Sequence, residues 1–453
     1  MQVVRRIIDT FSFENFPYKR VFLFLFIWIL SIMANYGVKR FLNLHIDTPT
    51  YFPFSIFNPS FHASGLLYAM LFIFIIYLTL RYRVYKNIIT TYLVGVSLIV
   101  LGNLSLGNID LAFINPIAGG DIQYYHNAIK IDSWQHWLST FNNTQESLFC
   151  HARTHPPGAL LIEKLFFTIS KNPIWISSIF LLLSSFSIVL VYKIFIELGK
   201  DKIFANKIGL LYSVIPSVNI YSLATLDAVI SMLINLVLLG VIIILESKKK
   251  ERIVVWSILS AASLTLTSFL TFGSIYLWAV LGVFSLFLVY FHKNTKILIL
   301  LILSIIVFLL VVFYLNQAYN YNYFVSFFTA SKLENPHGFM LFSDPFNYLA
   351  TRIEDVFEIA IFLSFGLIAV LSTIRYKLQH NLYIVLAFIA IGMLLLMFLA
   401  GAYRTGETAR ACLFIVGFIL ILIKDIPRSL LTPLITFAAL QTILMQVLGF
   451  YFW

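Results

Sequence analysis

Residues 297–314 read ILILLILSIIVFLLVVFY, a run without a single charged side chain. Roughly 17 to 25 apolar residues in a helix cross a hydrocarbon core of about 30 Å. Similar unbroken runs recur along the whole chain. A transmembrane barrel would instead show short segments of alternating hydrophobicity. The run therefore predicts an all-α fold, a polytopic bundle of transmembrane helices.

The composition supports the same fold class. The 453 residues are 60% hydrophobic and only 11% charged, whereas soluble proteins are about 25% charged. The net charge of +11 would suggest a nucleic-acid partner in a soluble chain, but in a membrane protein the positions of the charges matter more than their sum. We expect no nucleic-acid partner. No internal repeat or linker interrupts the pattern, so residues 1–453 are predicted to form one transmembrane domain.

The topology follows from the basic loops, because loops rich in Lys and Arg remain in the cytoplasm. This rule places the N-terminus inside and the C-terminus outside. No small-residue cleavage site follows the first span, so we expect it to stay as an anchor. About thirteen helices are predicted, at 21–37, 64–80, 88–106, 174–191, 208–221, 228–245, two within 253–291, 297–314, 359–374, 383–401, 411–423 and one after 428. We expect the chain in the plasma membrane, with its chemistry on the outer face.

The major outer loop, residues 107–172, is where the sequence predicts the active site. Asp121 follows Gly119 and Gly120. A carboxylate on such a flexible turn suits the general base that accepts a proton from a hydroxyl group. The alternative is a helix N-cap, and the two roles are compatible.

Short amphipathic helices are predicted to form a layer on the outer face. Residues 123–141 predict one helix, either flat in the membrane interface or packed against other outer loops. Residues 158–170 predict a short apolar helix that docks at the outer surface without crossing.

His155-Pro156-Pro157-Gly158 predicts a rigid turn in which His155 is held extended, because proline restricts the residue before it. Helix initiation is the alternative, since proline is common in a first turn. Arg153 lies close by in sequence. Cys150, His151 and His155 lack a second cysteine pair, so a structural zinc site is not favoured.

The outer turn at 403–410 contains Arg404, Glu407 and Arg410. Two arginines in one turn can bind a phosphate or pyrophosphate, with Glu407 orienting one of them. The alternative is anchoring at the interface by side chains that reach toward water.

Two acidic features are interpreted as structural. The stretch 352–358 is predicted to be an acidic helix N-terminus stabilised by the macrodipole, and Asp227 to cap or line the outer end of a hairpin. Cys150 and Cys412 could pair on the outer side, but two unrelated thiols are the preferred interpretation.

The order of these parts resembles the GT-C superfamily of polytopic membrane glycosyltransferases, related to mannosyl- and aminoarabinosyltransferases that use polyprenyl-phosphate sugars. In that group an Asp in a context like Gly-Asp-x-x-x-Tyr opens the major outer loop, and a His-Pro-Pro turn follows. Gly120-Asp121 with Tyr125, then 155–158, match this pattern, and Gly406–Arg410 resembles a late outer loop of some members. The likeness covers residues 118 to about 245. Here the Asp follows the third helix rather than the first, so residues 1–106 would include extra N-terminal helices.

The resemblance implies a role for each candidate residue. Asp121 would be the catalytic base, and Arg404 and Arg410 would hold the lipid phosphate. Tyr125, His155 and Arg153 would line the substrate pocket. No cofactor is certain, and a divalent metal ion at Asp121 and His155 remains open.

The expected function is therefore an integral-membrane glycosyltransferase that moves a sugar, with inversion, from a polyprenyl-phosphate donor to a glycan, lipid or protein acceptor. Its partners would be that lipid-linked sugar and membrane lipids. One alternative is a lipid-linked sugar flippase or transporter, which would place charged or helix-breaking residues near the bilayer midplane. Another is an O-antigen-type polymerase or ligase, which would not need Asp121.

Overall fold

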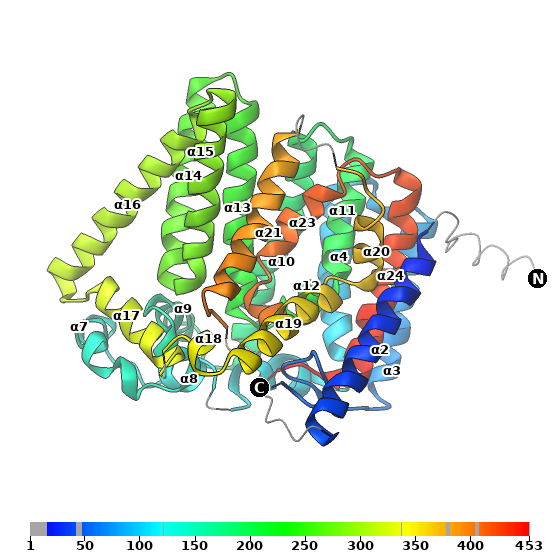
Figure 1. Cartoon of the computed structure of the whole chain (residues 1–453), viewed down its shortest axis with the longest axis horizontal. Helices are drawn as coiled ribbons and strands as arrows, with labels where there is room; N and C mark the ends of the chain where they lie inside the picture. Colours follow the sequence, from blue (N-terminus) through cyan, green and yellow to red (C-terminus); the bar gives the residue numbers. More distant parts are fainter. Residues whose placement is uncertain are drawn as a thin grey trace, which may run out of the picture.

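The computed structural model describes residues 16–41, 48–120, 122–336, 338–376, 381–403 and 407–452. Nearly all regular structure in these ranges is helical. Figure 1 shows a bundle of long helices with a layer of short helices at its lower end. The only sheet in the described residues is a single antiparallel pairing of β1 (Asn58–Pro59) with β2 (Gly449–Phe450).

Eight helices in the described residues are long and apolar enough to cross a membrane. A helix rises 1.5 Å per residue, so about 20 residues reach across the hydrocarbon core. These helices are α2 (Tyr18–Phe41), α10 (Pro173–Glu197), α13 (Leu226–Glu246), α14 (Lys250–Leu270), α15 (Ile275–His292, preceded by the 3₁₀ turn Phe272–Ser274), α16 (Lys296–Tyr319), α21 (Leu382–Leu399) and α24 (Arg428–Leu448). The predicted helical membrane fold is thus confirmed at this level.

The predicted count of thirteen crossings is not confirmed. Two further apolar helices, α3 (Gly65–Arg81) and α4 (Ile88–Leu104), are shorter. The remaining three predicted spans fall on broken or short helices: α11 (Lys202–Val214) with α12 (Pro216–Tyr221), α20 (Phe365–Leu371), and α22 (Thr408–Ala411) with α23 (Ile415–Leu422). Pro216 explains one break, because proline disfavours helical backbone at the residue before it. Ser364, with φ of 83°, separates α20 from the preceding helix.

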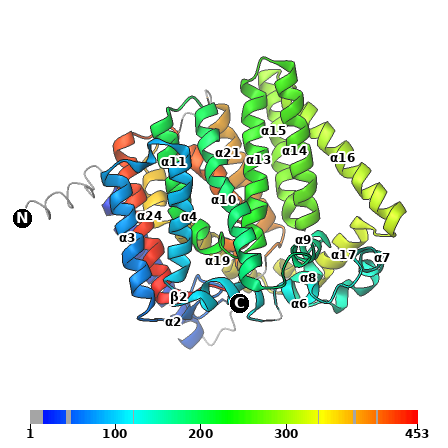
Figure 2. The same cartoon turned by 180° about the vertical axis from the view of Figure 1, so that it is seen from behind.

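The layer at the lower end of Figure 1 is built from segments far apart in the sequence. Figure 2 shows the same layer from behind, below α13, α14 and α16. It contains α6 (Tyr125–Ala128), α7 (Trp134–Thr144), α8 (Cys150–Thr154), α9 (Gly158–Phe167), α17 (Tyr323–Glu334), α18 (Met340–Ser343) and α19 (Pro345–Phe362). A π-helical turn (Asp110–Ile114) and α5 (Asn115–Ala118) lead from α4 into it, and a 3₁₀ turn (Gln145–Ser147) joins α7 to α8.

The single helix predicted at 123–141 is wrong. Two helices, α6 and α7, replace it, because Ser133 has extended backbone and its side chain accepts a hydrogen bond from the N–H of His136, which starts α7. The ten residues of α9 give only about 15 Å of helix, too short to cross. Packing against α14 is close, since a Cβ on Gly158 would overlap the carbonyl oxygen of Phe269.

The opposite end of the bundle carries the basic loops. Arg20 Nη1 donates to the carbonyl oxygen of Ser372 at 2.7 Å, and Lys200 pairs with Asp425 at 2.8 Å. Arg252 and Glu197 join the start of α14 to the end of α10 at 2.7 Å. These contacts show that the Lys- and Arg-rich loops predicted on one side do lie together at one end. Another basic segment there is the 3₁₀ turn Val84–Lys86.

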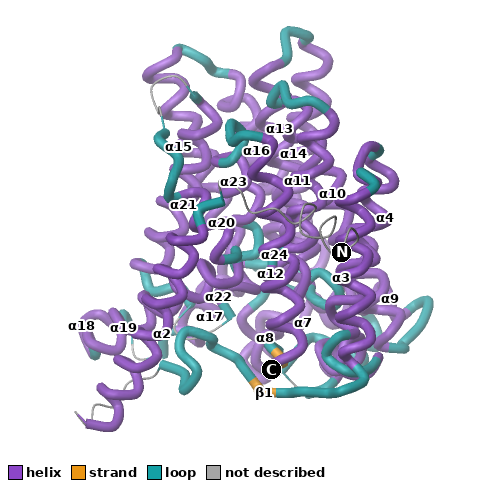
Figure 3. The backbone as a smooth tube through the Cα atoms, turned by 90° about the vertical axis from the view of Figure 1, so that its right-hand side faces the viewer, coloured by secondary structure: helices purple, strands orange, loops and turns teal. Residues whose placement is uncertain are grey.

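Small and amide side chains pack the centre of the bundle. Asn219 on α12 donates from Nδ2 to the carbonyl oxygens of Leu98 and Ser213 at 3.2 and 2.9 Å. Gly102 on α4 leaves room for that amide, because a Cβ there would overlap it. Close approach at glycine, with amide hydrogen bonds between helices, is typical of helix packing in membranes. Figure 3 shows the resulting stack from the side.

Candidate active site

Arg410 is the centre of the candidate site. It lies on α22, a single turn at the layer end of the bundle, and is only 5% exposed. Its Nε lies 3.2 Å from Oδ2 of Asp227, and its Nη2 pairs with Oε2 of Glu407. Glu407 adopts a left-handed conformation (φ 50°) just before α22. Two carboxylates therefore hold the guanidinium from different sides.

Asp227 reaches Arg410 from the first turn of α13. The N-cap of this helix is Thr225, whose hydroxyl accepts from the N–H of Ala228. The prediction that Asp227 lines the outer end of a hairpin is consistent with its place, but its ion pair with Arg410 was not predicted. No signal in the sequence indicates that pairing, because the two residues are 183 positions apart.

Two histidines complete the polar cluster. His151 Nε2 lies 3.2 Å from Arg410 Nη2 and 3.7 Å from Glu407 Oε2. Since arginine can only donate, this nitrogen accepts. Burial, together with the positive charge of Arg410, lowers the pKa of His151 well below its usual value. His151 is therefore a neutral acceptor at physiological pH.

His155 is fixed by its own turn. The backbone is extended (φ −117°, ψ 157°) and α9 begins after Pro157, so both the predicted extended conformation and the helix start are confirmed. Nδ1 lies 2.9 Å from the carbonyl oxygen of His151, which leaves Nε2 as the free acceptor of a neutral ring. Burial lowers its pKa. The ring of Tyr124 packs edge-on against it, 5.5 Å between centroids.

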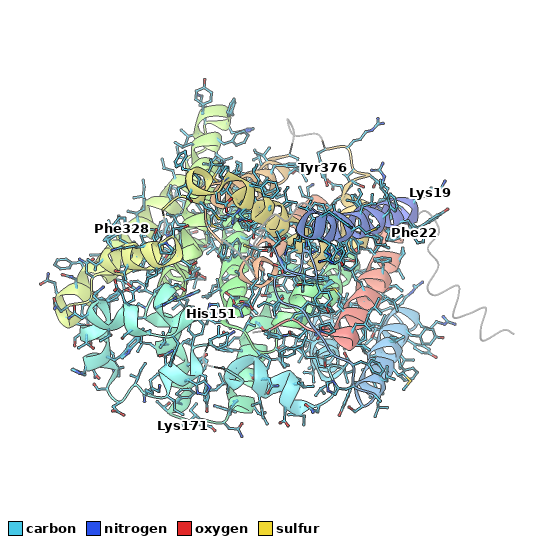
Figure 4. All side chains as sticks on the ribbon, turned by 60° about the horizontal axis from the view of Figure 1, so that its bottom comes forward. Lys19, Phe22, His151, Lys171, Phe328 and Tyr376 are labelled. Carbon is cyan, nitrogen blue, oxygen red and sulfur yellow. The ribbon has the colours of Figure 1, made fainter. Side chains whose placement is uncertain are left out.

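The chain next to Asp121 lies against this cluster. The carbonyl oxygen of Ile122 accepts a hydrogen bond from the N–H of His151 at 3.3 Å. Asp121, Arg404, Thr405 and Gly406 lie outside the described residues, so the roles predicted for Asp121 and Arg404 stay predictions. Figure 4, which turns the layer toward the viewer, places His151 near the middle of this face.

The other predicted pocket residues lie apart from Arg410. The hydroxyl of Tyr125 donates to the carbonyl oxygen of Lys171 at 2.7 Å, and its ring packs against Phe167. Tyr124, not Tyr125, faces the histidines. Arg153 lies on α8, which packs against α17, and its carbonyl oxygen accepts from Gln145 Nε2 at 2.9 Å. Its Nε is buried without a hydrogen-bond partner among the described residues.

Glu358 on α19 braces the turn that carries Arg410. Its Oε1 accepts from the N–H and hydroxyl of Ser55, and its Oε2 accepts from the hydroxyl of Thr408 at 2.8 Å and the N–H of Ala409 at 3.3 Å. The Ser55 hydroxyl also accepts from the N–H of Glu407. One buried carboxylate thus joins three distant segments and fixes the backbone around Arg410.

The interpretation of 352–358 as a helix N-terminus is wrong. α19 begins at Pro345 and ends at Phe362, so the three acids of this stretch lie in its second half, where the macrodipole does not favour them. Arg352 instead binds the carbonyl oxygens of Phe398 and Ala402 at the end of α21, at 2.7 and 2.5 Å. Neither oxygen of Glu354 has a partner among the described residues. Burial, with Glu358 and Asp355 nearby, raises the pKa of Glu354 to about 9.

The cluster is not a preformed metal site as far as the described residues extend. No group of three His, Cys, Asp or Glu side chains in those ranges is placed to share an ion. Cys150 is exposed and Cys412 buried, and both are free thiols. Arg410, Asp227 and Glu407 sum to one net negative charge when His151 is neutral, so the cluster can orient a base and polarise a hydroxyl.

Comparison with known proteins gives no match: no protein-family model, no curated protein and no solved structure is similar to this chain.

Proposed function

We propose that this protein is an integral-membrane glycosyltransferase that uses a polyprenyl-phosphate sugar on the outer face of the membrane. The observation that supports the proposal best is the buried Arg410 cluster, which lies against the backbone immediately after Asp121. The turn α22, which carries Arg410, lies beside α19 at the end of the bundle away from the basic loops (Figure 3). By the rule that basic loops stay in the cytoplasm, that end is outside.

In the proposed reaction the acceptor hydroxyl attacks the anomeric carbon of the sugar. Asp121 takes the hydroxyl proton, the new C–O bond forms, and the bond to the polyprenyl phosphate breaks with inversion. Tyr124, whose ring packs against His151 and His155, lies three residues after Asp121 in the sequence. The leaving phosphate carries the charge that must be stabilised.

The arginines would share that stabilisation unequally. Asp227 and Glu407 hold Arg410 in place but also offset its charge. In this proposal Arg404 therefore supplies most of the positive charge that stabilises the leaving phosphate, while Arg410 orients the site. A divalent ion with Asp121 remains part of the hypothesis.

The test is transfer by the purified full chain in lipid nanodiscs, with a panel of polyprenyl-phosphate sugars as donors. Loss of a general base should lower the rate of transfer by about 10²-fold to 10⁴-fold, so Asp121→Asn should transfer the sugar that much more slowly than the wild type. Asp132→Asn, at an exposed site nearby, is the matched control. The same assay with a chelator added tests whether transfer requires a divalent ion. Full activity of Asp121→Asn would exclude this mechanism and favour the polymerase or ligase alternative.

Transport of a lipid-linked sugar is the second candidate. The break between α11 and α12, beside the buried amide of Asn219, resembles the discontinuous helices that transporters use near the membrane centre. Movement of the lipid-linked sugar across a proteoliposome bilayer without covalent transfer would support transport instead.

A further inference from the structure

Glu163 is a buried acid that the proposed reaction does not yet use. It lies on α9, two turns after His155, and is only 2% exposed. Its Oε2 is buried without a hydrogen-bond partner among the described residues. Leaving a buried carboxyl oxygen unpaired costs free energy, so this position is unfavourable unless another molecule contacts it.

A second unpaired polar group lies on the helix that packs against α9. Asn127 on α6 is buried, and its Nδ2 has no hydrogen-bond partner among the described residues. An amide nitrogen donates, whereas a carboxyl group can donate or accept. A hydroxyl group of a ligand satisfies both, since it accepts and donates as well.

Tyr124 connects this pair of groups to the Arg410 cluster. Burial, followed by the charges of Asp227, Arg410, Glu163 and Glu407, determines the raised pKa of Tyr124. The geometry agrees, because Tyr124 is the N-cap residue of α6, which carries Asn127, and its ring packs against His151 and His155. Burial and then the charge of Glu163 also raise the pKa of Tyr125, the next residue.

We infer that Glu163 and Asn127 form a hydroxyl-binding subsite beside the Arg410 cluster, which contacts a sugar hydroxyl of the lipid-linked substrate. The identity of the hydroxyl as a sugar's rests on the proposed function. The ligand class is a polyhydroxylated group attached to a lipid phosphate.

The state of Glu163 follows from its surroundings. Burial raises its pKa to about 8, so at pH 7 it is a neutral acid that donates a hydrogen bond. The titratable groups that face it are Tyr124 and Tyr125. α14, which also packs on α9, has no ionisable side chain between Ile253 and Leu270.

The first experiment uses dicyclohexylcarbodiimide, which modifies protonated carboxyl groups in apolar sites, on the full chain in nanodiscs. Glu163 should be labelled at pH 7, and labelling should fall about tenfold by pH 9 as the acid ionises. Peptide mapping distinguishes the label on Glu163 from any label on Glu354. Glu163→Gln, which has no carboxyl group at this position, is the negative control. Absence of labelling at pH 7 would overturn the inference.

Protection of Glu163 from carbodiimide labelling by added lipids identifies the ligand. Polyprenyl-phosphate hexoses and pentoses should protect Glu163, whereas polyprenyl phosphate without a sugar should not. Equal protection by both would assign the subsite to the phosphate and overturn the inference, and so would no protection by any of them. Protection by a sugar donor without transfer in the wild type would uphold the subsite and refute the proposed reaction.

Kinetics test the role of the contact. Glu163→Gln keeps a neutral donor, so its KM at pH 7 should stay close to wild type and its activity should no longer fall above pH 8. Asn127→Ala should raise KM about fivefold to tenfold, the loss of one hydrogen bond, while the exposed Asn143→Ala should not change it. If the activity of Glu163→Gln still fell above pH 8 as it does in the wild type, Glu163 would not have the proposed role in binding the sugar hydroxyl.

Discussion

At the scale of single residues, the molecule is organised around a charge that is buried and paired. From the single turn α22, Arg410 reaches Glu407 just before that turn, Asp227 on α13 and the neutral His151 on α8. A buried ion pair adds little net stability when complete, but removal of one partner leaves an uncompensated charge. The cluster therefore tolerates substitution poorly.

Arg410→Ala should lower the free energy of unfolding by about 3–5 kcal/mol, because Asp227 and Glu407 would then lose the buried cation that lies between them. Arg252→Ala removes a more exposed pair at the basic end and should cost below about 1 kcal/mol. Unfolding followed by denaturant titration in detergent micelles measures both. Equal losses in the two variants would mean that the Arg410 cluster is no more than a surface pair.

Glu163 gives a prediction for pH. Its pKa rises from 4.5 to about 8 on folding, so its stabilising contribution is complete below pH 4.5 and is lost as pH rises toward 8. The wild type should therefore lose stability relative to Glu163→Gln across this window. Thermal unfolding of both proteins from pH 5 to 9 measures the difference. A constant difference would show that the carboxyl is ionised throughout.

At the scale of elements, α19 is amphipathic in the reverse sense of a helix in a soluble protein. Its polar side chains Arg352, Glu354 and Asp355 are buried, whereas Leu349 and Ile353 are 55% and 53% exposed. Apolar residues face outward where the surroundings are lipid. α19 therefore fits a helix at the membrane surface that turns its charges toward the Arg410 turn.

A spin label tests this orientation of α19. In a Cys150→Ser background, a label at Ile353→Cys should collide mainly with oxygen, which concentrates in lipid, and a label at Glu146→Cys mainly with a water-soluble nickel complex. Continuous-wave power saturation in liposomes gives both collision rates. Similar preference for nickel at the two sites would place the apolar face of α19 in water.

Sequence patterns predicted the long helices and the short helix α9, but not the division of 123–141 into two helices. Runs such as 297–314 need no tertiary information, because the bilayer alone selects their length. The start of α19 was missed, since the pattern around 352–358 resembles the polar edge of a span that begins at Ile359. The ion pair of Arg410 with Asp227 was not predicted either, because the two side chains come together only through the packing of α13 against α22. The turn at His155 was predicted, because proline fixes backbone locally.

At the scale of the whole molecule, the two ends of the bundle differ in charge. The loops that join α13 to α14 and α15 to α16 lie at the end away from the layer of short helices (Figure 1). These loops and the first turns after them contain Lys248–Lys250, Arg252 and Lys296. In intact cells, a membrane-impermeant maleimide should label Glu146→Cys but not Lys249→Cys, both in the Cys150→Ser background. Labelling in the reverse pattern would invert the topology and remove the outer-face assignment of the site.

The brace at Glu358 and the pairing of Asn58 with Phe450 have a consequence for biogenesis. The segment around Ser55 emerges early from the ribosome, yet its partners at Glu407 and Phe450 are made only near the end of synthesis. The early helices are therefore in the membrane before this loop can form its hydrogen bonds with the last part of the chain. A stalled nascent chain that ends before residue 400 should remain open to protease at the loop, and release of the complete chain should close it.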